Sequence, residues 1–319
     1  MRIGIDLGGT KTAGAIVGDD GAIIERVVLP TDPRSADAVI DGIFRVCEEL
    51  GIAGEKILHC VQNDNVGLTI GIGVPGTVNS KTGTVIKTPN LPLTNINLAE
   101  KINDKYNIPV FIENDANCAA LGESLAGAIK DTENAVLITL GTGIGSGLIL
   151  GGKLHTGMSG AAGELGHMVI FAEGRLCGCG RLGCWETYAS TTALVRTAHE
   201  FMGTHRESIL WNLCGGDLET LNGHMIFDAF RKEDSAARRA LKSYVEFLAI
   251  GIVNIINILD PEIICIGGGI SKAWDCLYPP LVDAVKAESN SLHSPSAPQI
   301  QIVQATLGND AGIIGAAFL

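Results

Sequence analysis

Three cysteines and a histidine lie close together in the middle of the sequence, in the stretch GELGHMVIFAEGRLCGCGRLGCWE (163–186). Structural zinc is bound by four nitrogen or sulfur ligands in a tetrahedron. Disulfides between such near neighbours are disfavoured, because a bridge needs particular Cα separations. The stretch therefore predicts a zinc site, with His155 and His199 as alternative fourth ligands and ordinary loop thiols as the alternative to any metal. The four predicted ligands are His167, Cys177, Cys179 and Cys184.

Two glycine-rich turns, DLGGTK (6–11) and LGTGIGSG (140–147), each come at the end of an apolar strand pattern. Glycine lets the backbone approach an anion closely, and successive backbone amides of such a turn point toward it. Asp6 could hold Mg²⁺ through water, and Lys11 could reach phosphate oxygens. A third glycine turn, GGG (267–269), follows a buried strand pattern. Together the three turns predict an ATP-binding site that lacks a GxxxxGK[ST] loop. The predicted nucleotide-binding residues are Asp6, Gly8, Gly9, Thr10, Lys11, Thr142, Gly143, Gly145, Gly267, Gly268 and Gly269.

Asp115 lies where a predicted strand, 108–113, meets a predicted helix that begins at about Ala116. In α/β folds, binding sites form at the edge where parallel strands end. A carboxylate there could accept the proton of a substrate hydroxyl during phosphoryl transfer, which contributes a factor of about 10²–10⁴ in rate. The alternative is that Asp115 or Asn114 simply caps the helix. The residues alone leave both interpretations open.

The bulk composition restricts the class of protein. The chain has 319 residues, of which 46% are hydrophobic and 18% charged, and its formal net charge is −12. This length exceeds what one core usually organises, so two domains are expected. The acidic charge argues against nucleic acid as the main partner, because phosphate binding needs a basic surface. The N-terminus has no secretion signal, and the apolar stretch 248–261 is too short for a membrane span, so we expect a cytoplasmic protein.

Predicted strands and helices alternate along the chain, as in α/β folds. The main elements are strands at 2–7, 12–18, 22–29, 67–74 and 108–113, a helix at 35–50, a hairpin at 134–152 and a final helix within 308–319. A strand–glycine turn–strand pattern occurs in each half, which suggests two related lobes whose turns face a common cleft. We expect one lobe of 1–116 plus about 305–319 and another of 117–304. The polar segment 59–65 is predicted to be a surface loop, and the charged segment 230–242 to be a solvated helix face.

In this order, the motifs DLGGTK, VPGTV, PNL, ENDAN, LGTGIGSG, GELGH and CGCGRLGCWE resemble those of the ROK family of sugar kinases and sugar-responsive repressors. The resemblance covers essentially the whole chain, and GELGH followed by CxCGxxGCxE is highly specific to this family. It implies an α/β, two-lobed, actin-like (ribonuclease-H-like) ATPase fold with a central cleft in which ATP and a hexose meet. It also implies structural Zn²⁺ at the four ligands named above.

The resemblance also implies roles for single residues. Asp115 matches the catalytic base that accepts the proton of the sugar hydroxyl. The positions that match sugar-binding residues are Gly76, Asn90, Asn114, Asp115, Glu164, His167 and Glu186. Zinc would then order the loop whose flanking glutamates bind the sugar. Because PNL is followed here by PLTN, and VPGTV by Asn79, the identity of the sugar stays open.

The activity that the resemblance implies is an ATP- and Mg²⁺-dependent hexokinase that phosphorylates the 6-hydroxyl of glucose. N-acetylmannosamine, N-acetylglucosamine, mannose and fructose are alternative substrates, and polyphosphate is an alternative donor. A homodimer is implied, with a tetramer as the alternative. The rival class is a sugar-sensing regulator without kinase activity. Repressors of the family carry a winged helix–turn–helix ahead of the first phosphate motif, and DLGGTK begins at residue 6, which leaves no room for one.

Overall fold

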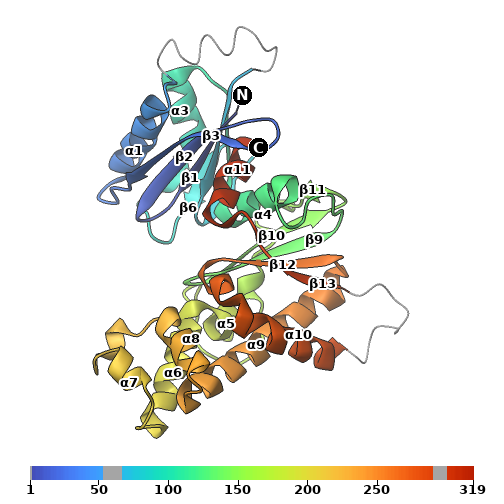
Figure 1. Ribbon diagram of the computed structural model, residues 1–319. Helices are drawn as coiled ribbons and strands as arrows, with labels where there is room; N and C mark the ends of the chain where they lie inside the picture. The colour runs from blue at the N-terminus through green and yellow to red at the C-terminus, as the bar shows by residue number, and fades with distance from the viewer. Residues whose placement is uncertain (1, 53–66, 290–299) are drawn as a thin grey trace. The chain divides into compact units, whose positions relative to one another are not determined.

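The computed structural model describes residues 2–52, 67–289 and 300–319 (Figure 1). The predicted surface loop at 59–65 lies outside these residues. The chain folds into two compact units. Unit 1 consists of Met1–Leu137, Gly147–Gly163 and Ala305–Leu319, and unit 2 consists of Ile138–Ser146 and Glu164–Gln304. The lobe boundaries expected from the sequence stay a prediction.

A five-stranded sheet in the order β3-β2-β1-β4-β8 forms the centre of unit 1. Strand β2 is antiparallel to both of its neighbours, whereas β1, β4 and β8 are parallel to one another. The strands are β1 (Arg2–Leu7), β2 (Lys11–Val17), β3 (Ile23–Pro30), β4 (Thr69–Val74) and β8 (Val110–Asn114). All five lie where strands were predicted, to within a few residues, so these predictions are confirmed.

One face of this sheet packs against two helices in a single apolar cluster. The helices are α1 (Ala36–Glu49) and α3 (Leu98–Tyr106). Helix α1 begins after Ser35, whose Oγ accepts a hydrogen bond from the Ala38 N–H at 3.1 Å, a typical N-cap. Fully buried Ile5 and Ile72 of the sheet and Ile43 of α1 belong to the cluster. A small antiparallel sheet adjoins it, with strands β5 (Thr77–Asn79), β6 (Thr84–Lys87) and β7 (Thr94–Asn97).

The other face of the sheet packs against helix α11, which also lies beside α4 (Figure 1). These helices are α4 (Asp115–Ala126) and α11 (Ala311–Ala317). Glycines bring the backbones together. A Cβ added to Gly71 of β4 would lie 1.7 Å from the Ala316 carbonyl oxygen, and one added to Gly315 would lie 1.7 Å from the Cys118 carbonyl oxygen. Neither position can hold a larger side chain without moving backbone.

A buried carboxylate anchors the end of α4. Glu123 is fully buried. Its side chain accepts hydrogen bonds from the backbone N–H groups of Ala128 at 2.7 Å, Leu307 at 2.8 Å and Thr306 at 3.2 Å. Buried charge is tolerated only when such bonds satisfy it. Glu123 therefore ties the segment that leaves α4 and the segment that leads into α11 to the same helix.

A second five-stranded sheet has the order β11-β10-β9-β12-β13. Its strands are β9 (Ala135–Leu140), β10 (Ile144–Leu150), β11 (Lys153–Leu154), β12 (Ile263–Gly267) and β13 (Gln301–Gln304). The helices of unit 2 are α5 (Glu186–Ala189), α6 (Thr191–Thr204), α7 (Leu210–Leu213), α8 (Gly223–Arg231), α9 (Ser235–Leu259) and α10 (Trp274–Ser289). The hairpin predicted at 134–152 is confirmed as β9 and β10.

Helix α9 is longer than its apolar sequence suggested, at 25 residues. Within the described part of the chain it is the one helix whose length and composition would suit a membrane span, but 56% of its most apolar window is buried inside the protein. Trp185 packs against it so closely that a Cβ added to Gly251 would lie 2.0 Å from the indole ring. The indole N–H donates to the Phe247 carbonyl oxygen at 2.8 Å. These contacts are those of a core helix.

The prediction of one solvated helix face over 230–242 is wrong. Helix α8 ends and α9 begins within this segment. Asp234 is 8% exposed and is the N-cap of α9, where its Oδ1 accepts from the Ala237 N–H at 2.9 Å. It also accepts from the Ser208 hydroxyl at 2.9 Å. A charged run can therefore conceal a helix boundary, because Asp is among the preferred N-cap residues.

The glycine contacts predict opposite effects for two alanine substitutions. Gly71→Ala should lower the free energy of unfolding by about 3 kcal/mol, because backbone must move to admit the methyl group. Gly42→Ala should raise it by about 0.5–1 kcal/mol, because Gly42 lies inside α1 with nothing within 4 Å of an added Cβ. Denaturant titrations of both variants and the parent measure these changes. Equal stabilities for the two variants would refute the assigned packing of α11.

Candidate functional site

At the carboxyl ends of three parallel strands, Asp6, predicted to bind magnesium, and Asp115, predicted to be the base, both neighbour Gly73. Asp6 of β1 pairs with Gly73 of β4. A Cβ added to Gly73 would lie 3.6 Å from the Cα of Asp115, the first residue of α4. Asp6 and Asp115 are far apart in the sequence but lie on either side of one glycine. Both residues therefore lie at the edge of the sheet where parallel strands end, which is where α/β folds form binding sites.

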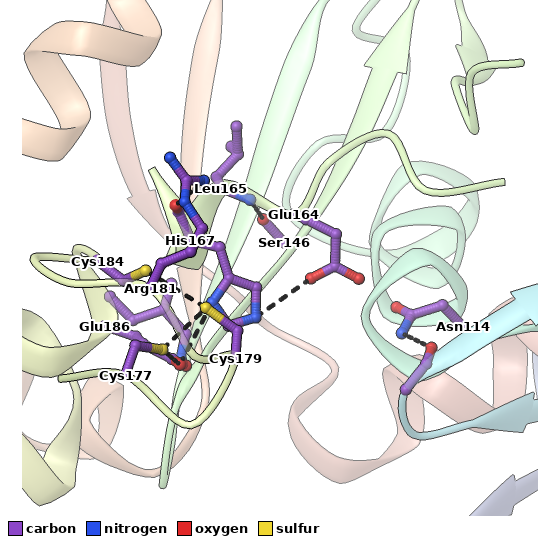
Figure 2. Close-up of polar contacts among 12 residues, drawn as sticks. Asn114, Ser146, Glu164, Leu165, His167, Cys177, Cys179, Arg181, Cys184 and Glu186 are labelled. Atoms are coloured by element: carbon purple, nitrogen blue, oxygen red, sulfur yellow. Dashed lines mark hydrogen bonds and ion pairs between the residues drawn. The ribbon is translucent and has the colours of Figure 1, made fainter. Parts of the chain in front are cut away.

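The cap of α4 belongs to Asn114. Its Oδ1 accepts from the backbone N–H of Ala116 at 2.9 Å and of Asn117 at 3.2 Å. Its Nδ2 donates to the Gly76 carbonyl oxygen at 2.9 Å (Figure 2). Gly76 has φ +99°, and an added Cβ there would lie 2.4 Å from the Lys87 carbonyl oxygen. Capping by Asn114 is thus confirmed, and the cap links two predicted sugar-binding residues.

Glu113, which the sequence analysis did not single out, is a buried carboxylate that hydrogen-bonds to residues around this strand end. It is 3% exposed. It accepts from the Ser80 hydroxyl at 2.6 Å, the Asn114 N–H at 2.8 Å and the Asn117 side-chain amide at 3.0 Å. A buried carboxylate with three donors holds its neighbours firmly. The signal in the sequence was an acidic residue in an otherwise apolar strand.

A buried thiol marks the centre of this acidic region. Burial raises the pKa of Cys118, and the negative charges of Glu113, Asp115 and Asp6 raise it further. Burial also raises the pKa of Asp6, against the opposing charges of Lys11 and Arg26. The concentration of carboxylates favours cation binding, since a nearby cation stabilises the ionised forms.

Two hydrogen bonds to Gly8 hold the first glycine turn, one from within the turn and one from Thr31. The Gly8 N–H donates to the Lys11 carbonyl oxygen at 2.9 Å, and the Thr31 hydroxyl donates to the Gly8 carbonyl oxygen at 2.8 Å. Thr10 and Lys11 are exposed. A Cβ added to Gly9 would lie 3.7 Å from the Cβ of Asn90, which brings a predicted sugar-binding residue next to the predicted phosphate turn.

The predicted zinc ligands converge in unit 2 (Figure 2). The ligand atoms of His167, Cys177, Cys179 and Cys184 all lie within 4.8 Å of one another. The Cys177 Sγ is 3.6 Å from the His167 Nδ1, and the Cys179 and Cys184 Sγ atoms are 3.6 Å apart. Zn–S bonds of about 2.3 Å at tetrahedral angles would place two thiolates about 3.8 Å apart. The donor set and its spacing fit zinc, and neither His155 nor His199 belongs to the group.

The thiols of this cluster differ in acidity. Burial raises the pKa of Cys177 and of Cys184, whereas a backbone hydrogen bond from Arg181 lowers the pKa of Cys179. Metal binding needs thiolates, so the burial that raises the pKa of Cys177 and Cys184 opposes the loss of protons that a bound ion requires there.

Two glutamates flank the histidine of the cluster. The His167 Nε2 lies 3.9 Å from the Glu164 Oε2, and its Nδ1 lies 3.4 Å from the Glu186 Oε1 (Figure 2). Cys177 donates to the same Glu186 oxygen at 2.9 Å. Three predicted sugar-binding residues therefore lie directly beside the cluster, with the two nitrogens of His167 facing different partners.

A cavity of about 300 Å³ in unit 2 adjoins the third glycine turn. Gly269, Thr191, His224, Arg231 and Lys272 are among its lining residues. Gly268 supports the turn: it has φ +84°, and an added Cβ would lie 2.4 Å from the Leu140 carbonyl oxygen at the end of β9. The sequence analysis did not single out His224 of α8 or Lys272 of the turn Gly269–Ala273, and it placed Arg231 only in the charged segment 230–242.

The sequence and the fold are both similar to those of known sugar kinases and repressors. The sequence matches the ROK family over residues 2–319. It is 35% identical to a glucokinase of Streptomyces coelicolor, over 100% of this chain and 97% of that protein. It is 30% identical to the xylose repressor of Bacillus subtilis, over 98% of this chain and 75% of that protein.

Among solved structures, a ROK family glucokinase from Streptomyces griseus in complex with glucose and AMPPNP matches with a TM-score of 0.81. That match has 34% sequence identity and covers 99% of this chain and 98% of the other. The actin-like, two-lobed α/β fold implied by the motifs is therefore confirmed. From its sequence and its fold alike, the chain belongs to the ROK family.

Proposed function

We propose that the protein is an ATP- and Mg²⁺-dependent sugar kinase that transfers the γ-phosphoryl group to the 6-hydroxyl of glucose. The observation that carries this proposal is the placement of Asp6 and Asp115 on either side of Gly73, at the carboxyl ends of parallel strands. The full-length similarity to glucokinases supports glucose as the acceptor.

Phosphoryl transfer needs a positioned acceptor, a proton acceptor and stabilisation of the charge on the transferred group. Asp115 accepts the proton of the sugar hydroxyl as the oxygen attacks. Asp6 lies where it can bind the water shell of Mg²⁺, and that ion neutralises phosphate charge when bound. The backbone amides of the two glycine turns hold the phosphates, as preorganised dipoles at no cost in reorganisation.

The sugar contacts proposed from the family resemblance are Glu164, Glu186 and the Nε2 of His167 in unit 2 and Asn114, Asn90 and Gly76 in unit 1. The zinc ligands, including the Nδ1 of His167, order the loop between the two glutamates. A displacement of about 1 Å in such positioning groups can cost about 10²-fold in rate. The nucleotide base binds in the cavity beside Gly269. We expect the enzyme to be a cytoplasmic homodimer.

There are two alternatives to a glucose kinase. A kinase for N-acetylmannosamine or N-acetylglucosamine would use the same machinery with room for an acetamido group. A sugar-sensing regulator without kinase activity is the rival class, since this chain is also similar to a xylose repressor. The kinase is favoured because Asp115 and both glycine turns are present.

The substrate is tested by ADP release from Mg-ATP with glucose, mannose, fructose, N-acetylglucosamine and N-acetylmannosamine. We expect the highest kcat/KM with glucose. A preference for an N-acetylated sugar would keep the mechanism and replace the substrate. Sugar binding without turnover on any of the five would favour the regulator.

Asp115→Asn should lower kcat by about 10²–10⁴-fold, because the amide cannot accept the hydroxyl proton. Glucose binding measured by calorimetry should change little. Asp104→Asn, at an exposed position of α3 in the same unit, is the matched control and should behave like the parent. Activity of Asp115→Asn within threefold of the parent would exclude it as the base.

The purified protein should contain one zinc ion per chain by elemental mass spectrometry. Cys179→Ser should lose this zinc and weaken glucose binding, since three ligands hold zinc less well than four. Cys276→Ser, which alters a buried cysteine outside the cluster, should keep both properties. Full zinc content in Cys179→Ser would contradict the assigned ligand set.

A further inference from the structure

The segment that joins α5 to α6 is bonded to the second glycine turn. The Thr191 N–H donates to the Gly141 carbonyl oxygen at 2.8 Å. The Thr192 hydroxyl donates to the Thr142 carbonyl oxygen at 2.8 Å. Two consecutive carbonyl groups of the turn are thus held by two consecutive residues. We call residues 186–192 the α5–α6 junction.

These bonds orient the amides of the turn. A peptide unit is planar and trans, so its C=O and the N–H of the next residue point in opposite directions. The Gly141 carbonyl faces the junction, so the Thr142 N–H faces away from it. The Thr142 carbonyl also faces the junction, so the Gly143 N–H faces away as well. These two N–H groups belong to the residues predicted to bind phosphate.

Buried, hydrogen-bonded residues anchor the junction. Trp185, directly before it, is fully buried and bonded to α9. Ser190 is 2% exposed, and its Oγ caps α6 by accepting from the Ala193 N–H at 3.1 Å. The turn is therefore bonded to a segment that buried contacts restrain.

The other end of the junction contacts the His/Cys cluster. Glu186 lies beside His167 and Cys177 through its Oε1, and its Oε2 accepts from the Ile144 N–H at 3.4 Å. A Cβ added to Gly143 would lie 2.5 Å from that second oxygen. One side chain therefore contacts both the cluster and the glycine turn.

We propose that the α5–α6 junction positions the amides of Thr142 and Gly143 for the nucleotide phosphates and couples nucleotide binding to sugar binding within unit 2. This inference rests on the proposed kinase function. Thr192 and the backbone N–H of Thr191 are positioning groups, which act through the turn, whereas the side chain of Thr191 lines the cavity beside Gly269. Because coupling between two sites is reciprocal, glucose should strengthen nucleotide binding by the same factor as nucleotide strengthens glucose binding.

The main test removes the backbone N–H group that donates to the Gly141 carbonyl oxygen. Thr191→Pro removes the donor to Gly141 at the first position of α6, where proline is well tolerated. The preceding Ser190 has φ −90° and ψ 172°, which suits a residue before proline. The ring occupies the place of the hydrogen and displaces the Gly141 carbonyl. Thr191→Ala, which keeps the N–H, is the matched control.

A milder pair keeps the test valid if Thr191→Pro does not fold. Thr192→Val removes only the hydroxyl donor to Thr142, and Thr192→Ser restores it. Thr204→Val removes a hydroxyl bond to the Phe201 carbonyl at the other end of α6 and controls for damage to the helix.

Calorimetry on the zinc-loaded full-length protein measures the dissociation constant of Mg-AMPPNP with and without glucose. We expect Thr191→Pro to bind Mg-AMPPNP at least tenfold more weakly and Thr192→Val about threefold to tenfold more weakly. Thr192→Ser and Thr204→Val should stay within twofold of the parent, and Thr191→Pro should bind at least tenfold more weakly than Thr191→Ala, which loses the same side chain from the cavity wall. Glucose affinity in the absence of nucleotide should not change, whereas the effect of glucose on nucleotide affinity should diminish in both weakened variants.

Three results overturn the inference. If the parent binds Mg-AMPPNP and both weakened variants bind it equally well, the junction does not position the turn, and the kinase proposal stands. If glucose affinity falls together with nucleotide affinity, the junction has only a general structural role. If the parent itself does not bind Mg-AMPPNP, the proposed function fails, and this inference fails with it.

Discussion

Close contact between backbones, made possible by glycine, is the constraint on which unit 1 depends. Helix α11 lies against β4 and against α4 at distances that no Cβ could share, at Gly71 and Gly315. This packing fixes α4, whose first residue is Asp115, relative to the strands whose ends carry Asp6 and Gly76. Glu123 adds a polar anchor at the opposite end of α4. This packing positions Asp115, whose Oδ1 also accepts from the Ala116 N–H at 2.9 Å.

Unit 2 achieves its precision differently. Its loop between Glu164 and Glu186 contains little regular structure, and short-range bonds and the four converging metal ligands define it. A loop of this kind has a large conformational entropy to lose, and a bound ion is an efficient way to offset it. Fully buried Trp185 connects this loop to the long core helix α9. The ordering of the loop thereby extends through the α5–α6 junction to the second glycine turn.

The family contains both kinases and repressors, so the fold does not determine which chemistry a member performs. The distinction lies in the residues that would touch phosphate and accept a proton. In this chain Asp115, the two glycine turns and the cavity beside Gly269 are all present. The motifs depart from those of the family's glucokinases at Asn79 and at the PLTN that follows Asn90 and Leu91, so they leave the identity of the sugar open.

The sequence by itself predicted the five strands of the first sheet, the hairpin of the second sheet, the helix over 35–50, the His/Cys set that converges and the family. These are local properties: periodicity reports which face of an element is apolar, and ligand spacing in one loop limits which atoms can meet. Only the tertiary structure decided that Asp6 and Asp115 both neighbour Gly73, that Glu113 and Glu123 are buried anchors, and that Thr191 and Thr192 hold the glycine turn. Most of these contacts join segments that are far apart in the chain, and the residues involved stand in stretches without a recognisable motif. Such contacts depend on which elements pack together, and no local sequence pattern encodes that.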